Sequence, residues 1–280
     1  MYYYKSLNDI SYNQIAACFN LAFSDYYLPI QFTGQELQNY FAISGADRNV
    51  SYGAFSNGEM VGFIFNSCNI YNNHKAVFDI GTGVVPEHRG NKVFTNLFSY
   101  AEQELKKQHI EKYYLEVLQQ NDKAISSYQK QGFTIIRNFS ILQANGNGKR
   151  AINTGVEYIP LHDFDWDTVG HCNCLNPSYE HSINILKINP NLYNVACRKE
   201  NDKISAFCIF SKQNGSIVQL GYSDINTLKL IVRQLLSEFN HIIVKNIDVN
   251  YSSILEMLHS INFSEVARQF EMVKTIYDNQ

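Results

Sequence analysis

The sequence has no long apolar run and no strong imbalance of charge, and each absence excludes a class of protein. Its apolar stretches, such as Ile204–Phe210, are far shorter than the roughly 20 residues that a membrane-spanning helix needs. The formal net charge is -3 at pH 7 and no basic stripe is present, so we expect no nucleic-acid partner. The N-terminus lacks a positively charged segment followed by an apolar one, which predicts a cytoplasmic protein without a secretion signal.

Cysteine is also sparse, and only two of the 6 cysteines lie close together. Cys172 and Cys174 flank Asn173 and follow His171, so a zinc site has to be considered. A second pair of ligands is missing, and His162 and His181 are the nearest further candidates. We therefore expect reduced loop thiols and no metal.

The residues that are plentiful predict a folded chain with two domains. Hydrophobic residues make up 45% and charged residues 18% of 280 residues, which is enough for a packed core and long enough for two of them. Residues 145–150, Asn-Gly-Asn-Gly-Lys-Arg, are polar and glycine-rich, as in a linker. The sequence thus predicts domains over residues 1–144 and 151–280.

The first half alternates strand and helix signals. Ser11 and Thr33 are plausible N-caps, the latter in a capping box with Glu36, and Asn57-Gly58 is typical of a hairpin turn. Helices are expected after both caps, from about Lys92 to Lys107 and over Asp122–Lys130. Strands are expected at Tyr2–Lys5, Ser51–Phe55, Val61–Ser67, Val77–Val85, Tyr113–Leu118 and Phe133–Leu142.

The second half repeats part of this order. Strands are expected at Tyr193–Arg198, Ile204–Ser211, Ser216–Tyr222, His241–Val249 and Ala267–Ile276, with helices at Thr227–Phe239 and Ser252–Ser260. Aligning Phe133 with Phe263 without a gap places Leu258 opposite Tyr128. This order indicates a duplicated unit, although two unrelated α/β segments would also explain it.

The segment Gly83–Lys92 joins a strand to the start of a helix. Unpaired backbone N–H groups and the positive end of the helix dipole at such a junction suit a pyrophosphate. Arg89 adds a permanent cation, and Gly90 allows close approach of the backbone. Taken alone, the segment is equally compatible with a simple strand-to-helix turn.

A second set of residues follows this segment at a specific spacing. It consists of Leu115-Glu116-Val117, Asn121, Ala124-Ile125, Tyr128 and Gly132-Phe133. With these residues, positions 50–142 resemble the GNAT superfamily of N-acetyltransferases. The resemblance implies a mixed α/β fold whose sheet is splayed between its fourth and fifth strands, with acetyl-CoA in the gap.

The resemblance also implies functional residues. Backbone groups of Val84 and Val85 would hold the acetyl and pantetheine part, Asn121 would bind pantetheine, and Tyr128 would lie beside the thioester sulfur. The pyrophosphate loop would be formed by Arg89, Gly90, Asn91, Lys92, Val93 and Phe94. Lys92 and Phe94 depart from the family pattern, which has glycine, or glycine or alanine, at those two positions.

The chemistry of amine acetylation suggests catalytic residues. A base must take the proton of the amine, and a donor such as Tyr128 assists the leaving thiolate. Asp79 is the first candidate base, on a predicted strand face shared with Gly81, Gly83 and Val85, and Glu116 is the second. Either carboxylate can instead be an ordinary strand residue.

Tyr26 and Tyr27 lie between the first two predicted helices, a connection that often lines the acceptor site in the resembling family. Two ordinary core or surface aromatics are the alternative interpretation in a chain with 19 tyrosines.

These observations predict two GNAT-like domains in tandem, of which only the first carries a cofactor site. The second half has no Pro-x-x-Arg-Gly loop after Tyr222, and Leu258 replaces the tyrosine. The expected activity is acetyl transfer from acetyl-CoA to a primary amine of a small molecule or peptide, by direct attack. The alternative is a non-catalytic acyl-CoA-binding or ligand-sensing protein with the same fold.

Overall fold

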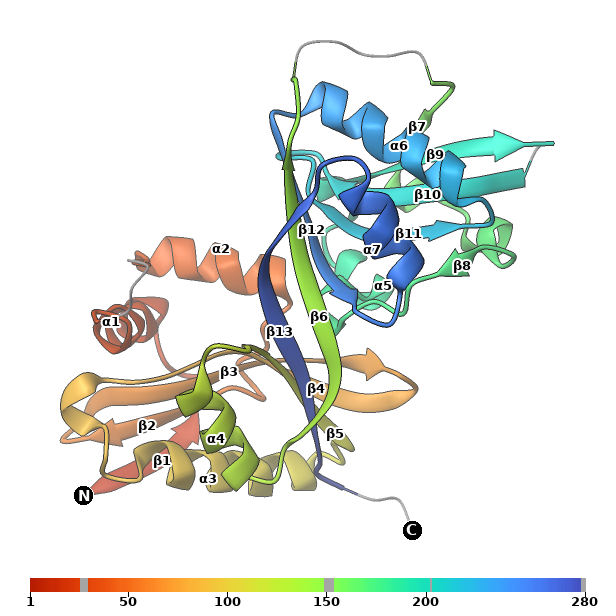
Figure 1. Ribbon diagram of the computed structural model, residues 1–280. Helices are drawn as coiled ribbons and strands as arrows, with labels where there is room; N and C mark the ends of the chain where they lie inside the picture. The colour runs from red at the N-terminus through yellow and green to blue at the C-terminus, as the bar shows by residue number, and fades with distance from the viewer. Residues whose placement is uncertain (26–29, 149–153, 202, 278–280) are drawn as a thin grey trace. The chain divides into compact units, whose positions relative to one another are not determined.

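The structure is a computed structural model that describes residues 1–280 except 26–29, 149–153, 202 and 278–280 (Figure 1). The chain forms two compact units. The first comprises the described parts of Met1–Glu116, Asp122–Thr134 and Met272–Gln280, and the second comprises Val117–Asn121 and Ile135–Glu271. Each unit is described by itself below.

These units differ from the predicted domains because the boundaries do not follow the chain order. The expected domain over residues 1–144 contains all of β6 (Thr134–Asn145) except Asn145, whereas most of β6 belongs to the second unit. In return, the end of β13 (Ser264–Thr275) belongs to the first unit. A linker signal in the sequence reports polar, glycine-rich composition and carries no information on which sheet the preceding strand joins.

The sheet of the first unit has the strand order β1-β2-β3-β4-β5, with the end of β13 beside β5. These strands are β1 (Tyr2–Ser6), β2 (Tyr52–Ser56), β3 (Glu59–Tyr71), β4 (His74–Val84) and β5 (Lys112–Leu118). Neighbours are antiparallel from β1 to β4, and β4 is parallel to β5. The hairpin turn at Asn57-Gly58 has φ values of 52° and 86°, which confirms the turn expected there.

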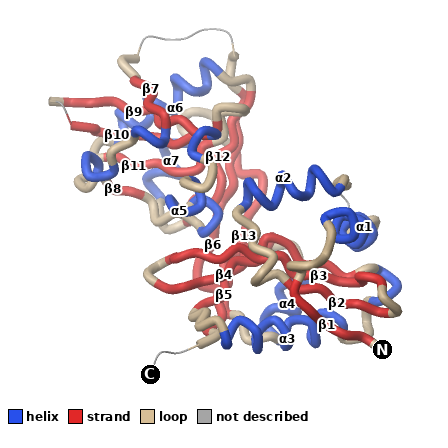
Figure 2. The backbone as a smooth tube through the Cα atoms, turned by 180° about the vertical axis from the view of Figure 1, so that it is seen from behind, coloured by secondary structure: helices blue, strands red, loops and turns tan. Residues whose placement is uncertain are grey.

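Helices cover both faces of this sheet (Figure 1, Figure 2). One face carries α1 (Tyr12–Ala22) and α2 (Gly34–Ser44), which begin at the predicted caps Ser11 and Thr33, each in a capping box. The other face carries α3 (Val93–Lys107) and α4 (Asp122–Lys130).

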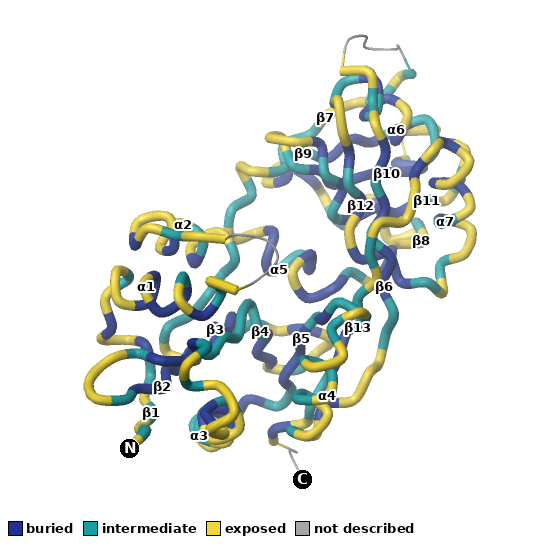
Figure 3. Tube along the Cα trace, turned by 60° about the vertical axis from the view of Figure 1, so that its left-hand side comes forward, coloured by how far each residue is buried: buried dark blue, intermediate teal, exposed yellow. Residues whose placement is uncertain are grey.

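Aromatic side chains fill the space beneath α1 and α2. The ring of Phe19 stacks on Phe63 at a centroid distance of 5.6 Å, and Phe63 stacks on Phe65 at 4.2 Å. Burial of each such side chain contributes about 1.5–3 kcal/mol. Residues 61–67 of β3 are all buried, and Figure 3 colours such buried parts of the chain dark blue.

The second unit has the strand order β6-β12-β11-β10-β9-β7, with the start of β13 beside β6. The strands other than β6 and β13 are β7 (Glu157–Pro160), β9 (Tyr193–Glu200), β10 (Lys203–Ser211), β11 (Ile217–Tyr222) and β12 (His241–Asp248). Helices α6 (Ile225–Glu238) and α7 (Ser252–His259) supply one hydrophobic core with these strands. The sequence missed the short elements between β7 and β9, which include β8 (Asn173–Cys174), the 3-10 turn Tyr179–His181 and α5 (Ile183–Leu186).

Candidate active site

Strands β4 and β5 pair over only part of their length. Their parallel register runs from Ala76↔Lys112 to Asp79↔Leu115 and then stops, although β4 continues to Val84. At the same point the register between β3 and β4 shifts, from Asn66↔Asp79 to Phe65↔Gly81, so Ile80 is an extra, bulged residue. A bulge bends the strand that carries it, and within the described part of the chain β4 has no pairing with β5 beyond Asp79.

The bulge also corrects a prediction about the face that Asp79 occupies. A side chain at Gly81 would meet Phe65 and one at Gly83 would meet Phe63 and Ala22, so both glycines face α1 and α2. Asp79 instead contacts Tyr128 on α4 and lies on the opposite face. Simple alternation predicted a shared face, and it fails because one extra residue shifts the period of two.

Asp79 accepts two hydrogen bonds on one oxygen. Thr82 Oγ1 donates to Asp79 Oδ2 over 2.7 Å, and Tyr128 OH donates to the same oxygen over 3.0 Å. The other oxygen, Oδ1, is buried and has no hydrogen-bond partner. Burial raises the pKa of Asp79 to about 6 against the opposing effect of these hydrogen bonds. A carboxyl with this pKa can take up and release a proton near neutral pH.

Tyr128 is held from both sides by aromatic rings. Phe94 and Phe133 lie edge-on to its ring, at centroid distances of 5.8 and 5.7 Å. The N–H of Phe133 donates to the carbonyl of Tyr128 where α4 ends, and Gly132 takes the positive φ of 90° that this turn requires. Burial and the Asp79 carboxylate raise the pKa of Tyr128 well above its usual value, so its hydroxyl stays protonated.

A pocket of about 320 Å³ lies next to these residues, at the start of α3. It contains six of the predicted cofactor residues, Val84, Arg89, Gly90, Lys92, Val93 and Phe94, together with His88, Thr95 and Ser127. The last three were not predicted. Ser127 on α4 directly precedes Tyr128, so the family spacing that marks Tyr128 could have identified Ser127 as well.

The first turn of α3 has no side-chain cap. Lys92 is the N-cap residue, makes no capping hydrogen bond, and has a left-handed backbone with φ 59°. No acidic residue lies in that turn. The positive end of the helix and its first N–H groups are therefore directed at the pocket without a carboxylate from α3 to neutralise them. Lys92 replaces the glycine of the family pattern at a position whose backbone favours glycine.

Arg89 lines the pocket, but its guanidinium is bound by other groups. It forms two hydrogen bonds with the carboxylate of Asp25, at 2.6 and 2.9 Å. It also donates to the carbonyl oxygens of Ala22 and Val84. The Arg89 hydrogen bond holds the pKa of Asp25 below its usual range. The charge of Arg89 is thus compensated locally, and its evident contribution is to tie the end of α1 to the loop.

The remaining predicted cofactor residues lie at the edge of this region. The N–H of Val85 donates to Val61 on β3. Because N–H directions alternate along a strand, the N–H of Val84 points to the side away from β3. The Asn91 side chain donates to the carbonyls of His88 and Arg89 within the loop. Asn121 is the residue before α4 and is half-buried.

Two further predictions have different outcomes. Glu116 follows Leu115, the register partner of Asp79, so its side chain lies on the opposite face of the sheet from Asp79. The structure therefore does not bring the two candidate bases together. Tyr26 and Tyr27 lie outside the described residues.

The corresponding region of the second unit is filled by its own chain. Strands β11 and β12 pair in parallel at Ile217↔Val244, as β4 and β5 do, and β8 then pairs with β11 at Gly221↔Cys174. Asp224 caps α6 by accepting from the N–H groups of Asn226 and Thr227. Both features that the first unit leaves open are thus occupied here.

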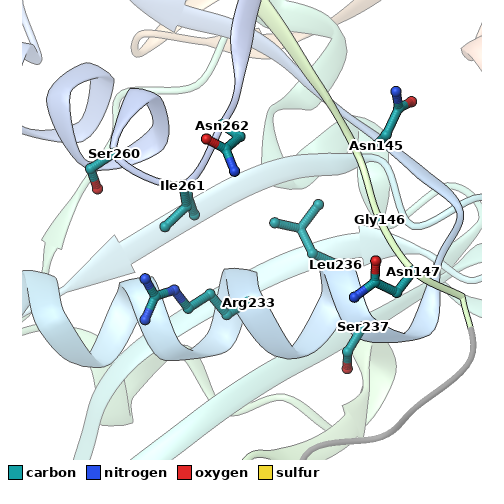
Figure 4. Close-up of a pocket in the computed structure, with 9 residues that line it drawn as sticks. All are labelled: Asn145, Gly146, Asn147, Arg233, Leu236, Ser237, Ser260, Ile261 and Asn262. Carbon is teal, nitrogen blue, oxygen red and sulfur yellow. The ribbon is translucent and has the colours of Figure 1, made fainter.

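The second unit has a cavity of about 420 Å³ at a different place (Figure 4). Arg233, Leu236 and Ser237 line it from the second half of α6, far along the helix from Asp224. The opposite wall includes Asn145 and Asn262. Its position therefore does not correspond to the start of the helix, where the pocket of the first unit lies.

The described residues contain no group of three or more His, Cys, Asp or Glu side chains arranged to hold a metal ion. Among them, no helix has the length and apolar character required to cross a membrane.

Residues 15–133 match the model of the acetyltransferase (GNAT) family. Three solved structures share the fold of the chain. A GCN5-related N-acetyltransferase from Sphaerobacter thermophilus has a TM-score of 0.66 at 12% identity, and the match covers 100% of this chain and 97% of that one. A putative acetyltransferase from Pyrococcus horikoshii has a TM-score of 0.66 at 16% identity, covering 98% and 89%.

The third is a tandem GNAT protein from the clavulanic acid biosynthesis pathway, with a TM-score of 0.62 at 10% identity and coverage of 100% and 99%. At these identities the likeness establishes the fold, which is the tandem GNAT fold predicted from the sequence. None of the curated proteins compared with the chain matches it.

Proposed function

The chain carries a GNAT-family domain over residues 15–133, and we propose that it transfers the acetyl group of acetyl-CoA to a primary amine of a small molecule or peptide. The observation that carries this proposal is the hydrogen-bonded pair of Asp79 and Tyr128 beside the pocket at the start of α3. A fold alone does not specify an activity, so the argument rests on these groups.

The residues of the first unit fit acetyl-CoA as cosubstrate. The uncapped first turn of α3 and the loop residues Gly90 and Lys92 offer N–H groups and one positive charge to a pyrophosphate. The N–H of Val84 can donate to the pantetheine or acetyl part, and Asn121, directly before α4, is proposed to contact pantetheine. When bound, acetyl-CoA supplies an activated acetyl group as a thioester.

The protein would contribute proton transfer and charge stabilisation. Asp79 takes a proton from the acceptor amine, because its pKa of about 6 leaves it ionised at neutral pH. Tyr128, whose hydroxyl stays protonated, donates to the departing thiolate. A backbone N–H of β4 stabilises the oxygen on which negative charge develops.

The second unit is proposed to bind no acetyl-CoA, since β8 and Asp224 occupy the positions that a pantetheine and a pyrophosphate would need. Native mass spectrometry of the full chain with acetyl-CoA should show one bound molecule per chain. Two bound molecules would contradict this part of the proposal.

Acetyl transfer is tested by incubating the full chain with acetyl-CoA and a panel of amines, with detection of products by mass spectrometry. Tyr128→Phe should lower turnover about 10²–10⁴-fold and leave acetyl-CoA affinity nearly unchanged. The matched control is Leu258→Met, at the aligned position of the second unit, which should leave turnover unchanged. Tight binding without any turnover would instead support the non-catalytic acyl-CoA-binding alternative, which the replacements at Lys92 and Phe94 favour.

A further inference from the structure

The hydroxyl of Tyr128 has one hydrogen, and the structure directs it to Asp79. The distance between Tyr128 OH and Asp79 Oδ2 is 3.0 Å. While this hydrogen bond exists, the same hydrogen cannot be donated to a leaving thiolate. For Tyr128 to act as an acid, its hydrogen bond to Asp79 must therefore break as the thiolate leaves. Protonation of Asp79 accomplishes this, because a carboxylic acid can donate to the phenol oxygen instead.

For this donation the proton must be held on Oδ2, because that is the oxygen of Asp79 that Tyr128 and Thr82 contact. The other oxygen, Oδ1, is buried and has no hydrogen-bond partner, so the negative charge of the carboxylate is poorly compensated. A buried carboxylate oxygen without a donor is costly, and protonation of the carboxyl removes that charge. Thr82 Oγ1, at 2.7 Å, fixes the carboxyl so that its two oxygens keep these separate environments.

We propose that Asp79 and Tyr128 form a single proton shuttle, in which the carboxyl that deprotonates the acceptor also resupplies Tyr128. This proposal rests on the proposed acetyl transfer. It assigns Thr82 as a positioning residue for the shuttle. An acid and a base that work independently would each have to be reset by solvent, whereas the shuttle returns to its starting state within the site.

The proton balance closes over one turnover. Asp79 accepts one proton from the attacking amine as the nitrogen–carbon bond forms. Tyr128 gives its proton to the sulfur as the carbon–sulfur bond breaks, and the phenolate oxygen takes the proton held by Asp79. The products are an amide and a thiol, and Asp79 is again a carboxylate that accepts from Tyr128. No other acid, base or co-reactant is consumed.

The surroundings of Asp79 make the proton transfer local. Among the described residues, the charge of Asp79 raises the pKa of two phenols, those of Tyr128 and Tyr113. Burial raises the pKa of Tyr113 well above its usual value, and its hydroxyl donates to Asn66, so Tyr113 does not compete for the proton.

A double-mutant cycle on the full chain tests the shuttle. Asp79→Asn keeps the shape of the side chain but cannot take up a proton, and Tyr128→Phe removes the hydroxyl. Each should lower turnover about 10²–10⁴-fold. The double variant should be about as slow as the slower single variant, because each change breaks the same pathway. Multiplication of the two losses would overturn the proposal.

A titration without cosubstrate gives a second readout. The carboxyl carbon of Asp79, followed by NMR against pH, should show a higher pKa in Tyr128→Phe than in the parent chain, because a donor to the carboxylate is lost. Thr82→Val should also raise that pKa, and Thr82→Ser should restore it. An unchanged pKa in Tyr128→Phe would show that the pair does not exist in solution.

The two measurements separate this inference from the proposed function. A chain that acetylates no amine but shows the coupled titration would refute acetyl transfer and, with it, the shuttle. A chain that acetylates amines with multiplicative losses in the cycle would refute the shuttle alone.

Discussion

The two units of this chain share a local framework and differ at the place where a cofactor would bind. In both, a helix ends with a residue of positive φ, Gly132 or Asn262, and the next N–H donates back five residues, from Phe133 to Tyr128 and from Phe263 to Leu258. This shared geometry supports the aligned positions predicted from the sequence. The first unit places a tyrosine hydroxyl against a carboxylate there, and the second places a fully buried leucine.

The difference teaches how a duplicated unit can keep its fold and lose a site. Strand β11 pairs with β12 near its start and with β8 near its end. Asp224 accepts hydrogen bonds from the first N–H groups of α6. Each satisfies backbone donors or acceptors that would otherwise need a ligand or water. Among the described residues, the second unit therefore fills both positions from its own chain, whereas the first unit fills neither.

The largest effect is expected from giving α3 the cap that α6 has. Lys92→Asp should weaken acetyl-CoA binding about 100-fold, or about 3 kcal/mol, because a carboxylate would accept the N–H groups offered to the pyrophosphate and repel it. Aspartate tolerates the left-handed backbone of this position. The measurement is calorimetry on the full chain. Asp224→Asn is the matched control and should leave affinity unchanged; equal affinity of both variants would place the phosphate site elsewhere.

The next effect concerns the filled gap of the second unit. A side chain at Gly221 would lie 2.5 Å from the Phe207 ring and 2.9 Å from Cys174 Sγ on β8. Gly221→Ala should therefore lower the free energy of unfolding by about 1–3 kcal/mol in urea denaturation. At Gly81 the nearest atom, on Phe65, is 3.7 Å away, so Gly81→Ala should change it by less than about 0.5 kcal/mol. Similar losses at both glycines would argue against a packed β8.

The two units should also respond to pH with opposite sign. Burial raises the pKa of Asp79 to about 6 in the folded state, above about 3.9 when unfolded, so folding holds the proton more tightly and stability falls as pH rises from 4 to 6. Burial lowers the pKa of His181 to about 3, below about 6.5 when unfolded, so stability falls as pH drops below 6.5.

Urea denaturation across this pH range measures how the free energy of unfolding changes with pH and so checks both predictions. Asp79→Asn should be more stable than the parent chain by about 2 kcal/mol at pH 7 and equally stable near pH 4. The free energy of unfolding of the parent chain should fall by about 2 kcal/mol between pH 6.5 and 5 because of His181, and His181→Gln should not show this fall. Parallel pH profiles for the parent and either variant would refute the corresponding buried group.

The smallest effect is expected from relieving the backbone of Lys92. Lys92→Gly should stabilise the chain by up to about 1 kcal/mol, since a left-handed backbone costs a side chain about 1–2 kcal/mol and glycine loses part of that gain to chain entropy. Gly90→Ala, at a φ of 77° with no atom near the added carbon, should destabilise it by a similar amount. Thermal denaturation should show a higher melting temperature than the parent chain for Lys92→Gly and a lower one for Gly90→Ala.

The sequence by itself determined the local structure of this protein. The caps Ser11 and Thr33, the turn at Asn57 and Gly58, and the bounds of α4 follow from short-range hydrogen bonding and backbone preference, which adjacent residues specify. The family spacing placed Tyr128 and the loop residues before α3 near one another, and the structure gathers most of that loop around one pocket.

Only the tertiary structure decided which groups these residues meet. Arg89 has its carboxylate partner at Asp25, 64 residues away, and a single bulged residue decides that Asp79 faces Tyr128. The exchange of β6 and β13 between the units, and the filling of the second gap by β8, join segments far apart in the chain. Strand pairings of this kind depend on backbone hydrogen bonds that nearly every residue can form, so the pattern of side chains does not predict which strands will pair.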